Sequence, residues 1–262
     1  MTTVVMAYFN RQYQLDKTLR SIAKSAYKDF NVIIVDDGSS DKPIVPELSY
    51  EVEVIRLEDK TWTNCSVVYN YGFNHALKKN PDIIIIQSAE CYHVGDVLSY
   101  ASNVKEGSYI AFGCFQIDRD TTLQEHDIMK LIKENDFRVS TDNDGQGQNA
   151  WWNHPVHTRC PQHWGAAITS KDLIKLNGFD ERFAFGYAYE DGYFVHQVEM
   201  LGLDIEITDM PFVVHQWHLH ENPTEPFDKV LLSEINKKIY DELMQGTEFR
   251  AEHKITPDLC GI

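Results

Sequence analysis

The sequence carries little positive charge for its length. Its 262 residues include 24 lysines and arginines against 40 aspartates and glutamates, a formal net charge of −16 with histidine neutral. Nonspecific binding to nucleic acid depends on a surplus of cations that displaces phosphate counterions, so we expect no nucleic-acid partner. The same balance argues against an anionic membrane surface as the main partner.

The sequence also lacks long apolar runs and a cysteine framework. No run approaches the roughly 20 apolar residues that a membrane-spanning helix needs, and no basic region precedes an apolar segment at the start. We therefore expect neither a transmembrane segment nor a secretory signal. The five cysteines are scattered and odd in number, without a Cys-x-x-Cys pair, which is not typical of disulfide-rich proteins or zinc sites. These features indicate a cytoplasmic protein.

The apolar residues form short runs that alternate with helical patterns in the first half of the chain. We expect strands at residues 3–8, 31–35, 52–57 and 83–86, and helices near residues 15–26 and 66–79. This alternation predicts an α/β fold with a mostly parallel central sheet flanked by helices. We expect one Rossmann-like domain over residues 1–225.

The second half of the chain is less regular. We expect strands at residues 109–115, 166–169 and 212–214, a helix at 123–135 and a long loop at 140–163. A loop of this length is usually functional, and we expect it to close as a lid over a bound ligand. Apolar residues that step by four between positions 227 and 243 predict an amphipathic helix. We therefore expect residues 226–262 to form a helical extension that packs on the domain.

Polar clusters directly follow the first two expected strands. The first cluster is Ala7-Tyr8-Phe9-Asn10-Arg11, and the second is Asp36-Asp37-Gly38-Ser39. In an open α/β sheet, ligands bind beyond the carboxyl ends of the strands, so these clusters mark a candidate crevice. Ordinary turn chemistry is the alternative, since Asp-Gly-Ser favours turns. Neither Gly-x-Gly-x-x-Gly nor Gly-Lys-Ser/Thr is present, which excludes the dinucleotide fingerprint and the P-loop.

Two further clusters contain possible metal ligands. Glu90 follows the expected strand at residues 83–86, where a carboxylate could hold a divalent cation against a diphosphate. His215 and His218 follow the last apolar run, and imidazole also binds metals. The alternatives are a polar strand cap for Glu90 and chance clustering among the 11 histidines.

Two adjacent carboxylates begin the expected helix that contains Phe194 and Val198. At about 100° per residue, Glu190 and Asp191 flank the apolar face of this helix and would point toward the protein. Burial raises the pKa of a carboxyl, and a general base needs that kind of environment. The alternative is the acidic charge that is common in the first turn of helices.

These four clusters, in this order, resemble the glycosyltransferase family 2 pattern on the nucleotide-sugar-binding fold called GT-A. VVMAYFNR and VIIVDDGSSD are its most specific parts, and NGFDERFAFGYAYEDGYF is similar to the C-terminal motif of galactosyltransferases and polypeptide N-acetylgalactosaminyltransferases. The resemblance implies inverting transfer of a sugar from a nucleotide diphosphate donor, with a UDP-sugar expected, to a glycan or other hydroxyl acceptor. It also implies a divalent cation, Mn²⁺ or Mg²⁺.

The resemblance assigns roles to individual residues. Asp191 would be the base, Glu190 would orient it or bind the acceptor, and His215 would be a metal ligand with His218 as second choice. The donor would be lined by Ala7, Tyr8, Asn10, Arg11, Asp36 or Asp37, Asn70, Gly72, Trp164 and Gly165.

One motif departs from the family pattern. The metal motif Asp-x-Asp is replaced by Gln87-Ser88-Ala89, with Glu90 directly after it. Glu90 and His215 could still hold the cation, and Gln87 could contact the ribose or the donor sugar. The change leaves an alternative function open, a non-catalytic nucleotide- or glycan-binding module. A nucleotidyltransferase ranks last because residues 7–20 lack a phosphate-binding loop rich in glycine and basic residues.

Overall fold

The computed structural model describes residues 1–136, 138–139, 147–219 and 228–259. The strands are β1 (Thr2–Tyr8), β2 (Phe30–Asp36), β3 (Glu51–Arg56), β4 (Ile83–Ser88), β5 (Cys91–Val94), β6 (Ser108–Gln116), β7 (Ala150–Asn153), β8 (Gly165–Thr169) and β9 (Asp204–His215). The helices are α1 (Gln12–Ile22), α2 (Ser66–Leu77), α3 (Val97–Ala101), α4 (Arg119–Thr122), α5 (Ile128–Glu134), α6 (Ser170–Leu176), the 3₁₀ turn η1 (Glu181–Phe183), α7 (Glu190–Met200) and α8 (Lys229–Leu243). In this part of the chain, no helix is long and apolar enough to cross a membrane.

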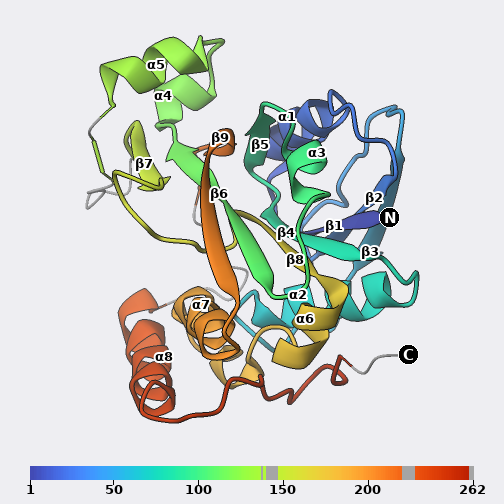
Figure 1. Cartoon of the computed structure of the whole chain (residues 1–262), viewed down its shortest axis with the longest axis vertical. Coiled ribbons are helices and arrows are strands. Elements are labelled where there is room, and N and C mark those ends of the chain that lie inside the picture. The colour runs from blue at the N-terminus through green and yellow to red at the C-terminus, as the bar shows by residue number, and fades with distance from the viewer. Residues whose placement is uncertain (137, 140–146, 220–227, 260–262) are drawn as a thin grey trace.

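The strands form one curled sheet in the order β3-β2-β1-β4-β8-β6-β9-β5, and β7 pairs with β6 (Figure 1). The α/β class is confirmed, and the expected parallel pairing is confirmed for β3-β2-β1-β4. The other half is mixed, because β8 runs antiparallel to both β4 and β6 while β6 and β9 are parallel. Among the described residues between β6 and β8, the helices α4 and α5 are too short to form a long crossover, so parallel entry into the sheet is not imposed there.

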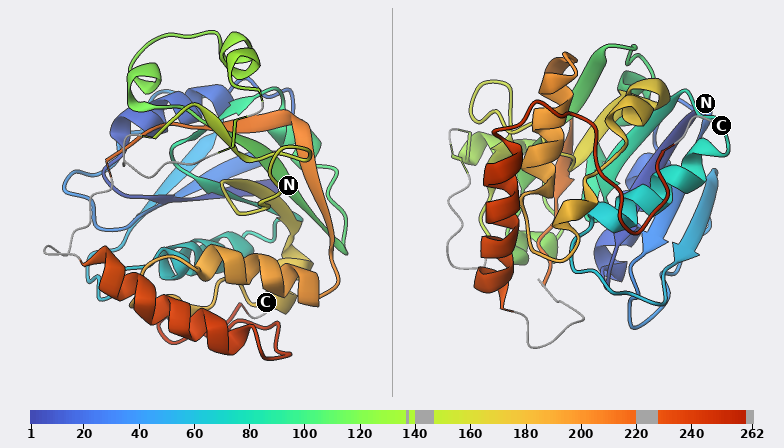
Figure 2. Two further views of the ribbon diagram at one scale, coloured as in Figure 1. Left: turned by 90° about the vertical axis from the view of Figure 1, so that its left-hand side faces the viewer. Right: turned by 90° about the horizontal axis from the view of Figure 1, so that it is seen from below.

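Helices cover both faces of the sheet. Successive strand residues point to opposite faces, and the residues on both faces are apolar and buried. Val5, Ile33 and Ile84 belong to one buried cluster, which also contains residues of α2, α6 and α7. Val4 and Met6 belong to a second cluster with residues of α1 and α3. Figure 2 shows the resulting helix–sheet–helix layers, with α8 outside α7.

Several expected elements differ from the structure. The expected helix at 123–135 is the shorter α5 at Ile128–Glu134, and the expected strand at 212–214 is part of the longer β9. The expected loop at 140–163 contains β7, which pairs with β6, so this part of the predicted lid belongs to the sheet. Residues 140–146 of that prediction and the predicted boundary at residue 225 lie outside the described residues.

Candidate active site

The carboxyl ends of the parallel strands meet at one edge of the sheet. In the register of the sheet, Tyr8 lies opposite Asp36, and Asp36 lies opposite Arg56. On the other side of β1, Ala7 lies opposite Ser88 at the end of β4. The polar segments that follow these strands therefore lie side by side, at the edge where α/β proteins bind ligands.

The two aspartates after β2 are each engaged by a cation. Asp36 is fully buried, and its Oδ2 accepts a hydrogen bond from Arg56 Nη1 at 2.7 Å. Asp37 pairs with Lys60 and accepts from Trp62 Nε1 at 2.9 Å. Burial raises the pKa of the Asp37 carboxyl, although the ammonium of Lys60 opposes this.

Asp37 is the more accessible of the two, because 8% of it remains exposed whereas Asp36 has no exposed surface. Sequence analysis missed the cationic partners Arg56 and Lys60, and also Trp62. Arg56 carries a usable signal, since it lies one residue before the end of the third expected strand, 52–57, and ends β3 at the same edge of the sheet.

Asn10 and Arg11 connect the end of β1 to its neighbours. Asn10 has a φ of +48°, a left-handed conformation that asparagine tolerates better than most residues. Its backbone N–H donates to Ser39 Oγ at 3.0 Å, which ties this turn to the one after β2. Arg11 Nη1 donates to Glu90 Oε1 at 2.7 Å. Tyr8 is buried in the core, and Ala7 is half-buried.

Glu90, His215 and His218 come together as a buried cluster of possible metal ligands. One ligand atom from each lies within 4.8 Å of the others. Glu90 Oε1 lies 3.4 Å from His215 Nε2 and 3.5 Å from His218 Nε2. The antiparallel pairing of β5 with β9 brings these segments together, since Cys91, next to Glu90, lies opposite His215.

The electrostatics of this cluster suit a divalent cation. Burial would raise the pKa of Glu90, but Arg11, His215 and His218 hold it well below its usual range. Burial lowers the pKa of His215, which favours the neutral imidazole that binds metals. Among the described residues, the buried atoms Glu90 Oε2 and His215 Nδ1 have no hydrogen-bond partner. One carboxylate and two imidazoles fit a transition-metal dication such as Mn²⁺ better than Mg²⁺, which prefers oxygen ligands.

Aromatic rings border the cluster. The ring of Trp152 lies 4.5 Å from that of His215 and 5.3 Å from that of Trp164, centroid to centroid. Trp164 is half-buried, so part of its ring is open to a ligand. Gly165 follows it at the start of β8 and is buried, and a Cβ there would lie 2.9 Å from Val213 Cγ1. Its lack of a side chain serves strand packing.

Three of the predicted donor contacts have structural roles instead. The fully buried Asn70 donates to Phe179 O at 2.8 Å and accepts from Phe179 N at 2.9 Å. A Cβ on Gly72 would lie 2.4 Å from Val5 Cγ1, so this glycine lets α2 pack on the sheet. Gln87 donates to the Cys91 carbonyl at 2.7 Å and is fully buried. The amides of Asn70 and Gln87 are already hydrogen-bonded within the protein, and Val5 fills the space beside Gly72. These contacts correct the prediction that the three residues line the donor.

Glu190 and Asp191 begin α7, as the sequence predicts. Glu190 is buried, and its Oε2 accepts from Asn64 Nδ2 at 2.6 Å. The thiol of Cys65 lies 3.5 Å from the other carboxyl oxygen. Ala188 and Tyr189, directly before the helix, have φ values of +61° and +74°. Two consecutive non-glycine residues in this region are strained, and such strain is often found at functional sites.

The environment of the pair raises both pKa values. Burial is the main cause of the raised pKa of Glu190, against the hydrogen bond from Asn64. Burial and then the negative charge of Glu190 raise the pKa of Asp191 to about 7. Asp191 is only half-buried, so its carboxyl can reach a ligand. A carboxylate with a pKa near neutral is suited to accept a proton.

The strand ends and the carboxylate pair lie on the same side of the molecule. The segment after β3 connects them, because Trp62 bonds Asp37 while Thr63 N and Asn64 N donate to Ala184 O at 2.9 and 3.1 Å. The charges of Glu190 and Asp191 raise the pKa of Tyr187, after burial, while Arg11 acts in the opposite direction. Tyr187 is therefore within electrostatic range of both the carboxylate pair and Arg11, and Arg11 contacts the possible metal ligand Glu90.

Comparison with known proteins identifies relatives of this chain. The family model described as glycosyl transferase family 2 matches residues 3–166. An uncharacterized protein of Methanocaldococcus jannaschii is 31% identical over 119 residues, which cover 45% of this chain and 47% of that protein. The chain thus spans about half the length of this relative.

Solved structures share the fold. A mannosyltransferase from Pyrobaculum calidifontis, in complex with GDP-Man and Mn²⁺, matches with a TM-score of 0.50 and 16% identity over 81% of this chain and 56% of that one. TarS 1–349 of S. aureus, in complex with UDP-GlcNAc, matches with a TM-score of 0.57 and 14% identity over 93% of this chain and 66% of that one. At these identities the likeness shows the fold alone, and the expected GT-A fold is confirmed.

Proposed function

This chain belongs to glycosyl transferase family 2, and we propose that it is an inverting enzyme that transfers a sugar from a nucleotide diphosphate to an acceptor hydroxyl. The observation that carries the proposal is the half-buried Asp191 carboxyl, whose pKa is raised to about 7 by burial and by Glu190. A carboxylate in that state is a competent general base on the same side of the molecule as the strand ends.

In the proposed step, the acceptor oxygen forms a bond to the anomeric carbon as the bond from that carbon to the diphosphate oxygen breaks. The acceptor proton moves to Asp191, and the electron pair of the broken bond leaves with the nucleoside diphosphate. Attack from the face opposite the leaving group inverts the anomeric centre. Glu190, held by Asn64 and Cys65, would keep Asp191 basic through its charge.

The donor would lie along the carboxyl ends of β1, β2 and β4. We propose a UDP-sugar, with Asp37 accepting a hydrogen bond from the base and Trp164 beside the donor sugar. Arg11, half-buried and bonded to Glu90, would face the diphosphate. Mn²⁺ or Mg²⁺ would be held by Glu90, His215 and His218, and when bound it would supply positive charge that stabilises the leaving diphosphate.

The first test is a screen of UDP- and GDP-sugars for hydrolysis and transfer in the presence of Mn²⁺, with the Asp191→Asn variant in parallel. Loss of a general base should lower the rate about 10²–10⁴-fold. A folded Asp191→Asn variant that keeps most of the activity would show that the base is another group.

The second test is calorimetry with UDP and GDP, with and without Mn²⁺. Stronger UDP binding with Mn²⁺, lost in Glu90→Ala and His215→Ala, supports the proposed cation site. Nucleotide binding without turnover of any donor would instead support the non-catalytic module, which the loss of Asp-x-Asp at residues 87–89 favours.

A further inference from the structure

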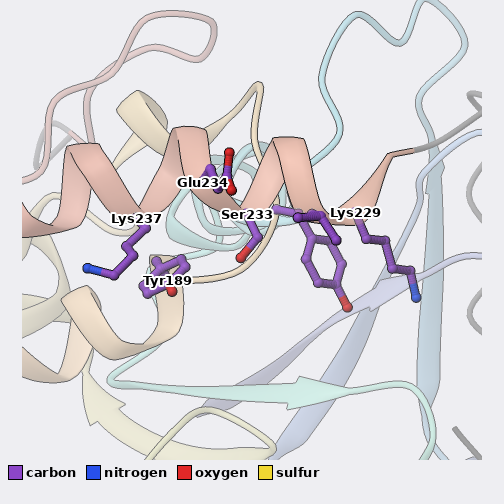
Figure 3. Close-up of a pocket in the computed structure, with 7 residues that line it drawn as sticks. Tyr189, Lys229, Ser233, Glu234 and Lys237 are labelled. Atoms are coloured by element: carbon purple, nitrogen blue, oxygen red, sulfur yellow. The ribbon is translucent and has the colours of Figure 1, made fainter. Parts of the chain in front are cut away.

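A cavity of about 440 Å³ lies between α8 and the strained segment before α7. From α8 it is lined by Lys229, Ser233 and Lys237, which are spaced by four residues and share one helix face. Tyr187 and Tyr189 line the opposite side. Figure 3 shows Ser233 and Lys237 projecting from α8 on the side where Tyr189 lies. The volume is within the range of small-molecule sites, roughly 300–1,000 Å³.

Hydrogen bonds fix the two walls of this cavity against each other. Tyr187 N donates to Leu232 O at 3.0 Å, and Asn236 Nδ2 donates to Ala188 O at 2.8 Å. The left-handed residues Ala188 and Tyr189 are thus held by α8 rather than by their own preference. The cavity is therefore a preformed feature of the fold.

The cavity is next to the proposed base. Tyr189 directly precedes Glu190, and its ring lies 5.4 Å from that of Tyr240 on α8. A Cβ on Gly192 would lie 3.6 Å from Tyr240, so the first turn of α7 packs against α8. The charge of Asp191 also raises the pKa of Tyr240, after burial. A molecule in the cavity would thus lie close to the group that must deprotonate the acceptor.

The lining favours an uncharged polyhydroxyl ligand. The Tyr189 ring offers a flat apolar surface, Lys229 Nζ lies over the Tyr187 ring at 5.5 Å from its centroid, and Ser233 and the lysines offer hydrogen-bonding groups. The charges nearly cancel, because Lys237 pairs with Asp241 and Glu234 offsets Lys229. An anionic ligand would need a surplus of cations, and a lipid would need a more continuous apolar wall. A sugar ring has one apolar face and a polar edge, which matches this lining.

We propose that this cavity is the acceptor subsite and that the acceptor is an uncharged saccharide, whose ring lies on Tyr189 and whose hydroxyls meet Ser233 and Lys229 of α8. The inference rests on the proposed function and gives it a substrate class. It assigns a binding role to a helix that lies outside the residues matched by the family model, 3–166.

The test measures binding of methyl glycosides of glucose, galactose, mannose and N-acetylglucosamine by saturation-transfer NMR, without any donor. We expect at least one glycoside to bind the wild-type chain and to bind Ser233→Phe, which fills the cavity, at least tenfold more weakly. Lys229→Glu is the second variant if Ser233→Phe does not fold, and it should also weaken binding. Lys238→Glu is the matched control, because Lys238 is exposed on α8 but does not line the cavity.

Two results would overturn the inference. One is that no glycoside binds the wild-type chain, and the other is that the bound glycoside binds the folded cavity variants as tightly as Lys238→Glu. Failure of the proposed function gives a different result, since glycosides would then bind while no nucleotide-sugar is hydrolysed or used in transfer.

Discussion

Asp191 is a residue whose ionisation we expect to control the rate. A general base must be deprotonated, and its pKa of about 7 predicts that kcat/KM rises tenfold per pH unit below 7 and levels above it. Glu190, Cys65 and Tyr240 lie within electrostatic reach, and Glu190 is the one whose charge raises this pKa. The measurement is the pH dependence of kcat/KM for donor hydrolysis.

The Glu190→Gln variant provides the internal check on this profile. Removing the neighbouring negative charge lowers the pKa of Asp191, so the rising limb should move to lower pH. The rising limb should still lie at a higher pH than the usual pKa of aspartate, because burial is the larger cause of the raised pKa of Asp191. An unmoved limb would mean that a different group titrates.

Asn64 is expected to act on the reaction through Glu190. Asn64→Ala removes the 2.6 Å hydrogen bond to this buried carboxylate, and we expect kcat to fall about 10–100-fold while KM for the donor changes little. Asn74→Ala, on the helix α2 that follows Asn64, is a matched control, because the Asn74 amide donates only to backbone carbonyls, those of Asn70 and Pro257. Equal loss of kcat in both variants would indicate a general effect on folding.

At the residue scale, the site is only partly predictable from the sequence. The resemblance to glycosyltransferase family 2 implied Glu90, His215 and His218 as metal ligands, and the structure brings these side chains together. Asn70 and Gln87 were expected to contact the donor, yet their amides complete buried networks. A buried amide and a ligand-binding amide look alike in sequence, because the difference lies in partners that only the tertiary structure supplies.

At the scale of elements, local periodicity was a reliable guide where it is strong. The expected strands at 3–8, 31–35 and 83–86 correspond to β1, β2 and β4, which are buried along nearly their whole length. The strands β5 and β7 were missed because each has four residues and is defined by its partner. Strand direction beyond β4 also depends on those partners, so the mixed half of the sheet could not be predicted.

Gly72 tests how closely α2 must approach the sheet. Alanine is favoured over glycine in a helix by about 1 kcal/mol, but a Cβ here would lie 2.4 Å from Val5 Cγ1 and 3.0 Å from Val35 Cγ2. The clash should dominate, so we expect Gly72→Ala to lower the free energy of unfolding by about 1–3 kcal/mol. Urea unfolding measures this.

Val5→Ala completes a double-mutant cycle with Gly72→Ala. Removing the valine methyl groups makes room for the new Cβ, so the double variant should be less destabilised than the sum of the two single variants. Strict additivity would contradict close packing between these two positions.

At the scale of the whole molecule, one buried carboxylate connects the last described segment of the chain to the core. Glu181 has no exposed surface, and its Oε2 accepts from the backbone N–H groups of Lys254 at 2.7 Å and Ile255 at 2.6 Å. Its Oε1 accepts from Asn70 at 3.1 Å. The segment after α8 is therefore held to the first turn of η1 by charge-assisted bonds rather than by apolar contact alone.

We expect Glu181→Gln to lower the free energy of unfolding by about 2–4 kcal/mol at pH 7, because an amide NH₂ would face backbone donors that need an acceptor. Burial would raise the pKa of Glu181, but bonds from Thr256, Ile255 and Asn70 hold it below its usual value. The stabilisation by ionised Glu181 is complete above the pKa of the unfolded state and is lost as pH falls through the pKa of the folded state. The difference in free energy of unfolding between wild type and Glu181→Gln should therefore become smaller below about pH 4. Urea unfolding at pH 7 and pH 3.5 measures both effects.

Glu252→Gln, at an exposed position of the same segment, is the control. It should change the free energy of unfolding by no more than about 0.5 kcal/mol at either pH. An equally small effect of Glu181→Gln would show that this segment is not held by the carboxylate.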